Sequence, residues 1–154
     1  MPSVITRSEE ETEALGKRLG RLLQAGDFIA LIGELGAGKT RFVRGVAEGL
    51  AVDPAEPVTS PTYALLHIHG GGRLPLYHFD LYRLAGDEDA AELGFAEYFH
   101  GDGVSLVEWA ERLTAEMPDQ HLSITFSHLG EEERRIEFAA AGKRYAKLIM
   151  SLFP

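Results

Sequence analysis

The sequence contains no cysteine, and this absence removes several classes of function. Without thiols there are no disulfide bonds, no thiolate metal sites and no cysteine nucleophile. Long hydrophobic runs are also missing, because the longest plainly apolar stretch, Phe28 to Ile32, is far shorter than the roughly 20 residues of a membrane-spanning helix. The first residues turn acidic at positions 9–11, which is not the pattern of a secretory signal. We therefore expect a cytoplasmic protein with no membrane segment.

Positive charge is scarce: 15 lysine and arginine residues stand against 24 aspartate and glutamate residues, and the net charge is -9. A field of this sign repels phosphate backbones, so we expect contact with RNA to be local or made through partner proteins. Lys143, Arg144 and Lys147 form the one basic cluster, on the expected final helix. The simplest interpretation is a solvated helix end favoured by the helix dipole, and a partner or RNA contact is the alternative.

The 154 residues suffice for one globular domain with a buried core, and we expect one domain over residues 1–154. Ser8 and Glu11 form a capping-box pattern ahead of leucines at helical spacing. The apolar run 27–32 predicts a strand buried on both faces, and the apolar spacing of residues 38–50 predicts a helix. Further strands are expected at residues 63–69, 74–80, 104–107, 122–128 and 134–140, with a final helix from about Lys143.

A complete phosphate-binding motif separates that first strand from the helix, since residues 33–40 read Gly-Glu-Leu-Gly-Ala-Gly-Lys-Thr. Glycines allow successive N–H groups to converge on phosphate oxygens, and the following helix adds its positive end. We expect Lys39 to neutralise the β- and γ-phosphates and Thr40 to place its hydroxyl on Mg²⁺. A plain glycine-rich turn is the alternative. The expected nucleotide contacts are Glu34, Leu35, Gly36, Ala37, Gly38, Lys39, Thr40 and Arg41. The predicted fold class is α/β, a P-loop NTPase-like domain with a mixed parallel and antiparallel sheet flanked by helices.

Two acidic residues end expected strands and are candidates for the second metal-side carboxylate that P-loop enzymes need. They are Asp80, after Leu-Tyr-His-Phe, and Glu108, after Val-Ser-Leu-Val. We expect Asp80 to hold the water shell of Mg²⁺ and Glu108 to orient or activate the attacking water, so Thr40, Asp80 and Glu108 form the expected metal site. With Lys39, these two acids are the expected catalytic residues. A solvated strand terminus is the simpler alternative for either acid.

Side chains near these motifs have open roles. Thr59, Ser60 and Thr62 lie in a proline-rich loop where nucleotide switches often carry a γ-phosphate sensor, although a plain Ser-Pro turn is the alternative. Trp109, the one tryptophan, either fills the core or stacks near the nucleotide.

Three histidines invite a metal-site interpretation. His67 and His69 have strand spacing, with His78 on the next expected strand, but surface or packing roles are far commoner for such residues. We therefore expect no transition-metal site here.

The sequence also contains no asparagine, so the Asn-Lys-x-Asp motif by which GTPases read guanine is absent and ATP is favoured by elimination. One alternative is a small P-loop kinase, although such enzymes usually carry an arginine-bearing lid and the stretch 86–96 is acidic. The other alternative is a nonhydrolysing, nucleotide-controlled interaction module.

Several segments, in a fixed order, resemble the bacterial TsaE family, formerly called YjeE. The resemblance spans roughly residues 28–113, and Arg41 stands where a second threonine is common in the family. The similar segments are residues 32–40, Ser-Pro-Thr-Tyr at 60–63, Tyr-His-Phe-Asp-Leu-Tyr-Arg-Leu at 77–84, Glu-Leu-Gly at 92–94, Glu-Tyr-Phe at 97–99 and Val-Glu-Trp-Ala-Glu at 107–111.

The resemblance implies an ATPase required to make threonylcarbamoyladenosine, a modification of the adenosine beside the anticodon of tRNA. In the family, ATP binding and hydrolysis support turnover of a complex of TsaD and TsaB, and TsaD makes the transfer. The resemblance also implies ATP and Mg²⁺ as cofactors and an active site with Lys39, Thr40, Asp80, Glu108 and Trp109. We further expect a monomer that hydrolyses ATP slowly alone, is activated by these partners and meets tRNA only through them.

Overall fold

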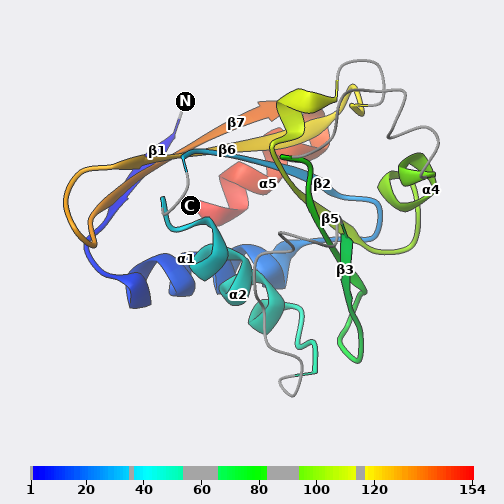
Figure 1. The fold of residues 1–154 in the computed structure, drawn as a ribbon, viewed down its shortest axis with the longest axis horizontal. Coiled ribbons are helices and arrows are strands. Elements are labelled where there is room, and N and C mark those ends of the chain that lie inside the picture. Colours follow the sequence, from blue (N-terminus) through cyan, green and yellow to red (C-terminus); the bar gives the residue numbers. More distant parts are fainter. Residues whose placement is uncertain (1, 35–36, 54–65, 83–93, 114–116) are drawn as a thin grey trace.

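The computed structural model describes residues 2–34, 37–53, 66–82, 94–113 and 117–154. Within these ranges one seven-stranded sheet has the order β1-β7-β6-β2-β5-β4-β3 (Figure 1). Its centre is parallel and consists of β6 (His121–His128), β2 (Phe28–Ile32), β5 (Val104–Glu108) and β4 (Leu76–Asp80). Antiparallel strands extend both sides, namely β3 (Leu66–His69) next to β4, β7 (Arg134–Ala141) next to β6, and β1 (Ser3–Thr6) next to β7. The expected mixed sheet is confirmed.

Helices cover the sheet in two groups. The larger hydrophobic cluster joins inward side chains of the sheet to α1 (Glu9–Leu22), α2 (Lys39–Gly49) and α5 (Lys143–Leu152). The smaller cluster includes side chains of α4 (Phe95–Phe99) and the 3₁₀ turn η1 (Ala110–Arg112). Strand β2 alternates between them, because Ile29 and Leu31 belong to the larger cluster whereas Phe28 and Ala30 belong to the smaller one. The prediction of a strand buried on both faces is therefore confirmed.

The start of α1 follows the predicted capping pattern. The side chain of Ser8 accepts a hydrogen bond of 3.1 Å from the backbone N–H of Glu11, which satisfies one of the free donors at a helix start. Strand β1 and helix α4 have no counterpart among the expected elements. Each is short, four and five residues long, and neither has a long periodic pattern.

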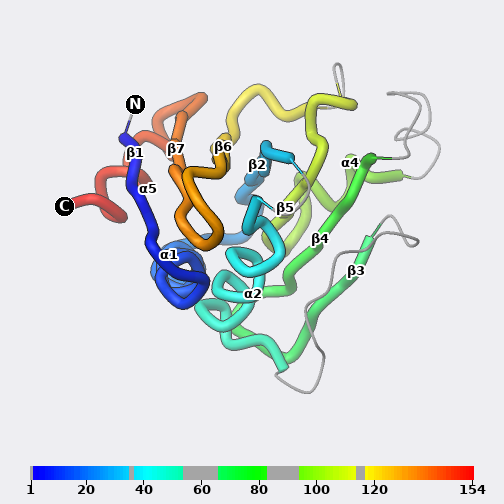
Figure 2. The backbone as a smooth tube through the Cα atoms, turned by 60° about the vertical axis from the view of Figure 1, so that its left-hand side comes forward, coloured from blue at the N-terminus to red at the C-terminus, as the bar shows by residue number. Residues whose placement is uncertain are grey.

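Helices α1 and α2 pack with their backbones in contact, and they run side by side in Figures 1 and 2. A Cβ atom built on Gly16 would lie 2.2 Å from the carbonyl oxygen of Phe42, and one on Gly45 would lie 2.0 Å from that of Glu13. Gly20 and Gly49 make similarly close approaches. Because only glycine permits this spacing, α1 fixes the position of the helix that begins at the phosphate-binding loop.

The basic cluster requires a correction. Helix α5 begins at Lys143, so the cluster lies in its first turns, where the helix dipole disfavours positive charge. Arg144 is instead held by Asp27, through bonds of 2.7 Å from Nη2 and 3.1 Å from Nε, and it also donates to the carbonyl of Leu22. The hydrogen bond that Arg144 donates to Asp27 raises the pKa of Arg144 above its usual value. Arg144 thus links α5 to the end of α1.

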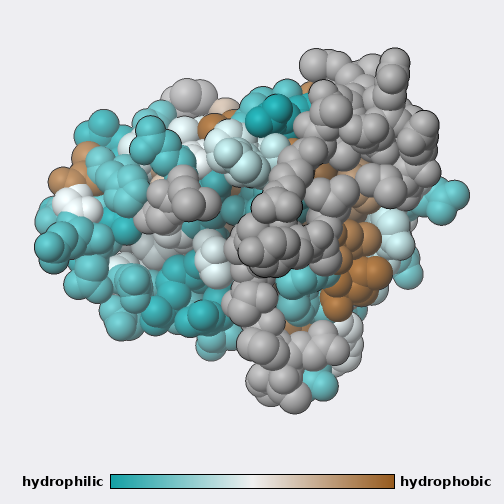
Figure 3. Space-filling view, viewed as in Figure 1, coloured by the Kyte–Doolittle hydropathy of each residue, from teal (hydrophilic) through white to brown (hydrophobic). Residues whose placement is uncertain are grey.

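The surface is uneven in polarity. In the view of Figure 3, the side formed by α1 and α2 is mostly hydrophilic, and apolar surface gathers near β3, where Ile68 is 51% exposed. In the described ranges, the helices are all too short or too polar to cross a membrane.

Candidate nucleotide site

The site is built where β2 ends and α2 begins, as the motif predicts. Gly33 has φ 152, and a Cβ there would lie 2.9 Å from the carbonyl oxygen of Phe126. Gly38 has the left-handed φ of 95 and precedes α2 without a side-chain cap, so the first N–H groups of α2 have no capping side chain to accept from them. Between these glycines, the backbone N–H of Ala37 donates to the carbonyl of Glu34 at 3.1 Å, whereas Leu35 and Gly36 lie outside the described residues.

Lys39, the first residue of α2, is buried within the site, and only 5% of its surface is exposed. Its Nζ donates a 2.6 Å hydrogen bond to the carbonyl of Gly33 and lies 3.7 Å from Oε1 of Glu108. The same ammonium lies 5.2 Å from the centre of the Trp109 ring, within range of a cation–π contact. The positive charge of the phosphate-binding loop is therefore already surrounded by a carbonyl, a carboxylate and an aromatic face.

The two expected carboxylates end neighbouring parallel strands. Asp80 of β4 and Glu108 of β5 are register partners, so both lie at the carboxyl edge of the sheet beside the phosphate-binding loop. Their surroundings differ. Glu108 is buried, 4% exposed, whereas Asp80 is more open and accepts a 3.0 Å hydrogen bond from the backbone N–H of Tyr82. One acid is thus enclosed and the other faces solvent at the same edge.

His78 makes a contact that sequence reasoning did not find. Its Nε2 lies 2.7 Å from Oε2 of Glu108, and the histidine is completely buried. In the described part of the chain, no group of three or more histidine and acidic side chains could hold a metal ion, so His67, His69 and His78 do not form one. The sequence signal available was the position of His78, two residues before Asp80 and therefore on the same face of β4.

Trp109 lies in the wall of the site. Its ring packs on Tyr82, with centroids 5.1 Å apart, and it also contacts the smaller hydrophobic cluster. The backbone of Trp109 has φ 61, a left-handed conformation that is costly for a bulky residue and that collects at functional sites. Trp109 therefore fills part of the core, and its stacking near a nucleotide stays a prediction.

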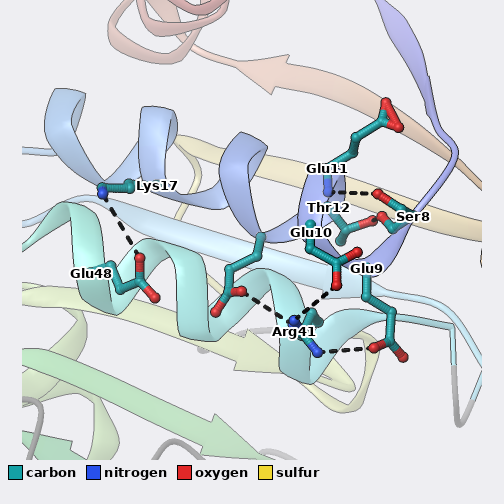
Figure 4. A network of polar contacts seen from close by, with 9 residues as sticks. Ser8, Glu9, Glu10, Glu11, Thr12, Lys17, Arg41 and Glu48 are labelled. Carbon is teal, nitrogen blue, oxygen red and sulfur yellow. Dashed lines mark hydrogen bonds and ion pairs between the residues drawn. The ribbon is translucent and has the colours of Figure 1, made fainter.

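The side chain of Arg41 lies between α2 and the acidic residues of α1 (Figure 4). Its guanidinium lies 2.9 Å from a carboxylate oxygen of Glu9, 3.3 Å from one of Glu13 and 3.9 Å from one of Glu10. Three acidic residues in and after the first turn of α1 therefore balance the charge that Arg41 adds beside the motif. Two of the three acidic residues in the first turn of α1, Glu9 and Glu10, thus contact Arg41.

Lys39, Asp80, Glu108 and Trp109 line one cavity of about 430 Å³. Arg134 also lines the cavity, although no motif in the sequence points to it. Its side chain lies against Gly38, and its Nε would be 3.5 Å from a Cβ atom built on that glycine. Its Nη1 donates to carbonyls in the turn between β6 and β7.

The proline-rich loop with Thr59, Ser60 and Thr62 lies outside the described residues. The cavity is lined by Glu9, Thr12, Gly38, Lys39, Thr40, Arg41, Arg44, Asp80, Glu108, Trp109, Glu132 and Arg134.

Comparison with known proteins places this geometry in a family. The TsaE protein of tRNA threonylcarbamoyladenosine biosynthesis from Bacillus subtilis (strain 168) is 43% identical over 147 residues, which are 96% of this chain and 90% of that protein. The protein of the same description from Treponema pallidum (strain Nichols) is 43% identical over 135 residues, covering 88% and 98% of the two chains. The crystal structure of YdiB from Bacillus subtilis is similar with a TM-score of 0.83 and 40% identity, covering 98% of this chain and 93% of that one.

The family model described as threonylcarbamoyl adenosine biosynthesis protein TsaE matches residues 6–136, which include every site residue discussed above. The match extends well beyond residues 28–113, since it includes α1, β6 and the first residues of β7. By sequence, by fold and by the family model, the chain belongs to the TsaE family.

Proposed function

We propose that this protein binds and hydrolyses ATP with Mg²⁺ and that it supports tRNA threonylcarbamoyladenosine synthesis by a complex of TsaD and TsaB. One observation carries the chemical part of the proposal. A phosphate-loop lysine, a hydroxyl at the first turn of α2 and two carboxylates on neighbouring strands open onto the same cavity. The pathway part rests on family membership and on the names of the relatives.

The donor set suits a nucleotide bound with magnesium. Mg²⁺ prefers oxygen ligands, and the Thr40 hydroxyl and the carboxylates of Asp80 and Glu108 are oxygen donors lining the cavity. Lys39 and the uncapped start of α2 supply positive potential for phosphate oxygens. Thr40, Asp80 and Glu108 would hold the magnesium ion, which would supply positive charge for the phosphoryl group. Lys39 would bind phosphate oxygens, and Glu108 would orient a water molecule.

Lys39 has to exchange partners when phosphate arrives. Its Nζ is held by the Gly33 carbonyl and lies near Glu108 and Trp109. Phosphate oxygens compete for the same ammonium and form stronger, charge-assisted hydrogen bonds. Because Trp109 is the one tryptophan of the chain, its fluorescence offers a direct measure of this exchange.

The first test compares nucleotide binding of the wild-type protein with that of Lys39→Ala. We expect the loss of this charge-assisted contact to weaken ATP affinity by roughly two orders of magnitude, measured by calorimetry or Trp109 fluorescence, with circular dichroism unchanged. Lys17→Ala is the matched control, because it removes one positive charge from the exposed α1–α2 surface, where Lys17 pairs with Glu48. Equal ATP affinity in the wild type and a folded Lys39→Ala variant would remove the proposal.

The second test measures phosphate release with and without purified TsaD, TsaB and tRNA. Release without any added acceptor argues against a small kinase. Binding without release, even with both partners and tRNA present, would favour a nucleotide-controlled interaction module and contradict the proposed hydrolysis.

A further inference from the structure

The carboxylate of Glu108 has two oxygens with different neighbours. Oε2 lies 2.7 Å from Nε2 of His78, and Oε1 lies 3.7 Å from Nζ of Lys39. His78 has 0% of its surface exposed and Glu108 has 4%, so solvent barely reaches this contact. A buried hydrogen bond to a carboxylate is among the stronger ones, and leaving either partner without it is costly.

The proton on the imidazole can be assigned from this network. An ionised carboxylate only accepts hydrogen bonds, so Nε2 of His78 is the donor. Its other ring nitrogen, Nδ1, is buried and has no hydrogen-bond partner among the residues that the structure describes. A proton on Nε2 satisfies the contact with Glu108, and among the described residues Nδ1 has no acceptor for a second proton.

The backbone that carries the ring is held on both sides by strand pairing. His78 lies within β4, which pairs with β5 on one side and with β3 on the other, and its register partner on β5 is Leu106. Glu108 is the last residue of β5 and is joined to β4 again by the hydrogen bond from Leu81 N–H to its carbonyl, at 3.0 Å. The flexible part of the pair is the glutamate side chain, and the hydrogen bond from His78 removes its freedom to rotate.

We propose that His78 is a positioning residue for the hydrolysis proposed above. It holds Oε2 of Glu108, which leaves Oε1 directed to Lys39 and the cavity, where a water molecule attacking phosphate has to be oriented. The inference rests on the proposed function for its chemistry and on the His78–Glu108 contact for its geometry. Holding a reacting group in one orientation lowers the barrier without adding a new contact to the nucleotide.

The matched pair of variants is His78→Gln and His78→Asn. The amide nitrogen of glutamine reaches the position of Nε2 and can donate to Glu108, whereas the shorter asparagine cannot. We expect His78→Asn to lower ATP turnover by about 10- to 100-fold, the usual cost of losing a hydrogen bond that orients a functional side chain. We expect His78→Gln to retain most of the turnover. ATP affinity should change little in both, because His78 is not a lining residue of the cavity. Full turnover in His78→Asn would overturn the proposal.

A double-variant experiment separates positioning from a general packing defect. In a Glu108→Gln background, His78→Asn should cause no further loss of turnover, because the residue through which His78 acts is already altered. If the two losses multiply, His78 acts independently of Glu108 and the proposal fails.

Nitrogen-detected NMR of the imidazole tests the geometry independently of turnover. We expect a protonated Nε2 whose proton exchanges slowly with water, and a marked shift of this signal in Glu108→Gln. An Nδ1–H tautomer would overturn the positioning role whatever the activity. If the wild-type protein shows no turnover, with or without partners, both the proposed hydrolysis and the positioning role are wrong. The NMR result would still show whether His78 contacts Glu108.

Discussion

At the scale of single residues, the site separates two carboxylates by their surroundings. Glu108 is enclosed between His78 and Lys39, and such a buried charge is tolerated because both neighbours supply positive potential or a donor. Asp80, at the same level of the neighbouring strand, is more exposed. An exposed carboxylate suits the water shell of a metal ion, and an enclosed one suits the orientation of a single water molecule.

This difference predicts distinct effects of removing each acid. Asp80→Ala should weaken ATP affinity more with Mg²⁺ than with EDTA, because a carboxylate that positions the metal's water shell matters only when metal is present. Glu108→Ala should preserve binding and depress turnover by roughly 100-fold or more. Calorimetry measures the ATP affinity of each variant with Mg²⁺ and with EDTA, and phosphate release measures its turnover. If Glu108→Ala loses magnesium-dependent affinity while Asp80→Ala keeps it, the two roles are exchanged.

Tyr77 makes stability depend on pH in the alkaline range. Its hydroxyl donates a 2.6 Å hydrogen bond to Asp102, and this bond, with burial, raises the pKa of Tyr77 to about 12. In the unfolded chain the phenol titrates near 10, so the folded state keeps its proton longer and stability falls as pH rises from 10 to 12. The free energy of unfolding should fall by about 2 to 3 kcal/mol, because each unit of pKa difference between the folded and unfolded states is worth about 1.4 kcal/mol. Tyr77 is only 8% exposed, so solvent screens this contribution little.

Urea unfolding at pH 8, 10, 11 and 12, each compared with Tyr77→Phe, isolates this contribution from the other groups that titrate there. The difference in unfolding free energy between the wild type and Tyr77→Phe should shrink across the range. A constant difference would mean that the hydrogen bond to Asp102 does not alter the titration of Tyr77.

At the scale of elements, the position of α2 depends on its glycine contact with α1. Gly45→Ala should destabilise the protein by about 2 to 3 kcal/mol, because the added Cβ would lie 2.0 Å from the carbonyl oxygen of Glu13 and the helices would have to separate. The control is Gly130→Ala in the β6–β7 turn, where the nearest atom to a built Cβ is 3.8 Å away. Thermal unfolding compares the two. Equal melting temperatures for both variants would show that the helices adjust without cost.

The elements that sequence predicted well have strong local patterns. Strand β2 is a short apolar run between turn residues, and α2 repeats apolar residues at helical spacing, so each is readable without knowledge of its neighbours. Strand β1 is different, because its four residues have a mixed burial pattern and are ordered by pairing with β7, more than a hundred residues away. Local sequence carries little information about such a pairing.

The residues of the candidate site also differ in how far local sequence predicts them. Lys39 and Thr40 were readable because their motif is continuous in sequence, and Asp80 and Glu108 because each ends a recognisable strand. The contact of His78 with Glu108 joins residues 30 apart, and Arg134 reaches Gly38 from the far end of the chain. Both depend on strand order and register, which no local motif specifies. The ion pair of Arg144 with the distant Asp27 was unpredictable for the same reason. The dipole interpretation of the basic cluster was wrong for another reason, because the cluster lies at the start of α5 and not at its end.

At the scale of the whole molecule, positive charge for catalysis is in short supply. Phosphoryl transfer gains from a cation beyond the phosphate-loop lysine and the metal ion. Arg41, Arg44 and Arg134 line the cavity. Arg41 pairs with acidic residues of α1, Arg44 is exposed on α2, and Arg134 donates to carbonyls of the β6–β7 turn. The loop expected to act as a switch, residues 53–62, has three prolines and neither arginine nor lysine. With a net charge of -9, we expect a further cation, or an ordered loop, to be supplied by a partner.

We therefore predict that the isolated protein hydrolyses ATP slowly and that TsaD and TsaB together accelerate it. Docking can order the loop around the γ-phosphate or add a charge in trans, and an arginine supplied in this way is worth roughly 10³- to 10⁵-fold in rate. The measurement is steady-state phosphate release during titration with the partners. Lys39→Ala with saturating partners is the control, because any release that remains belongs to the partners themselves. Turnover of roughly tens per second by the isolated protein, within the ordinary range of enzymes, would contradict partner gating and leave the proposed ATPase activity standing.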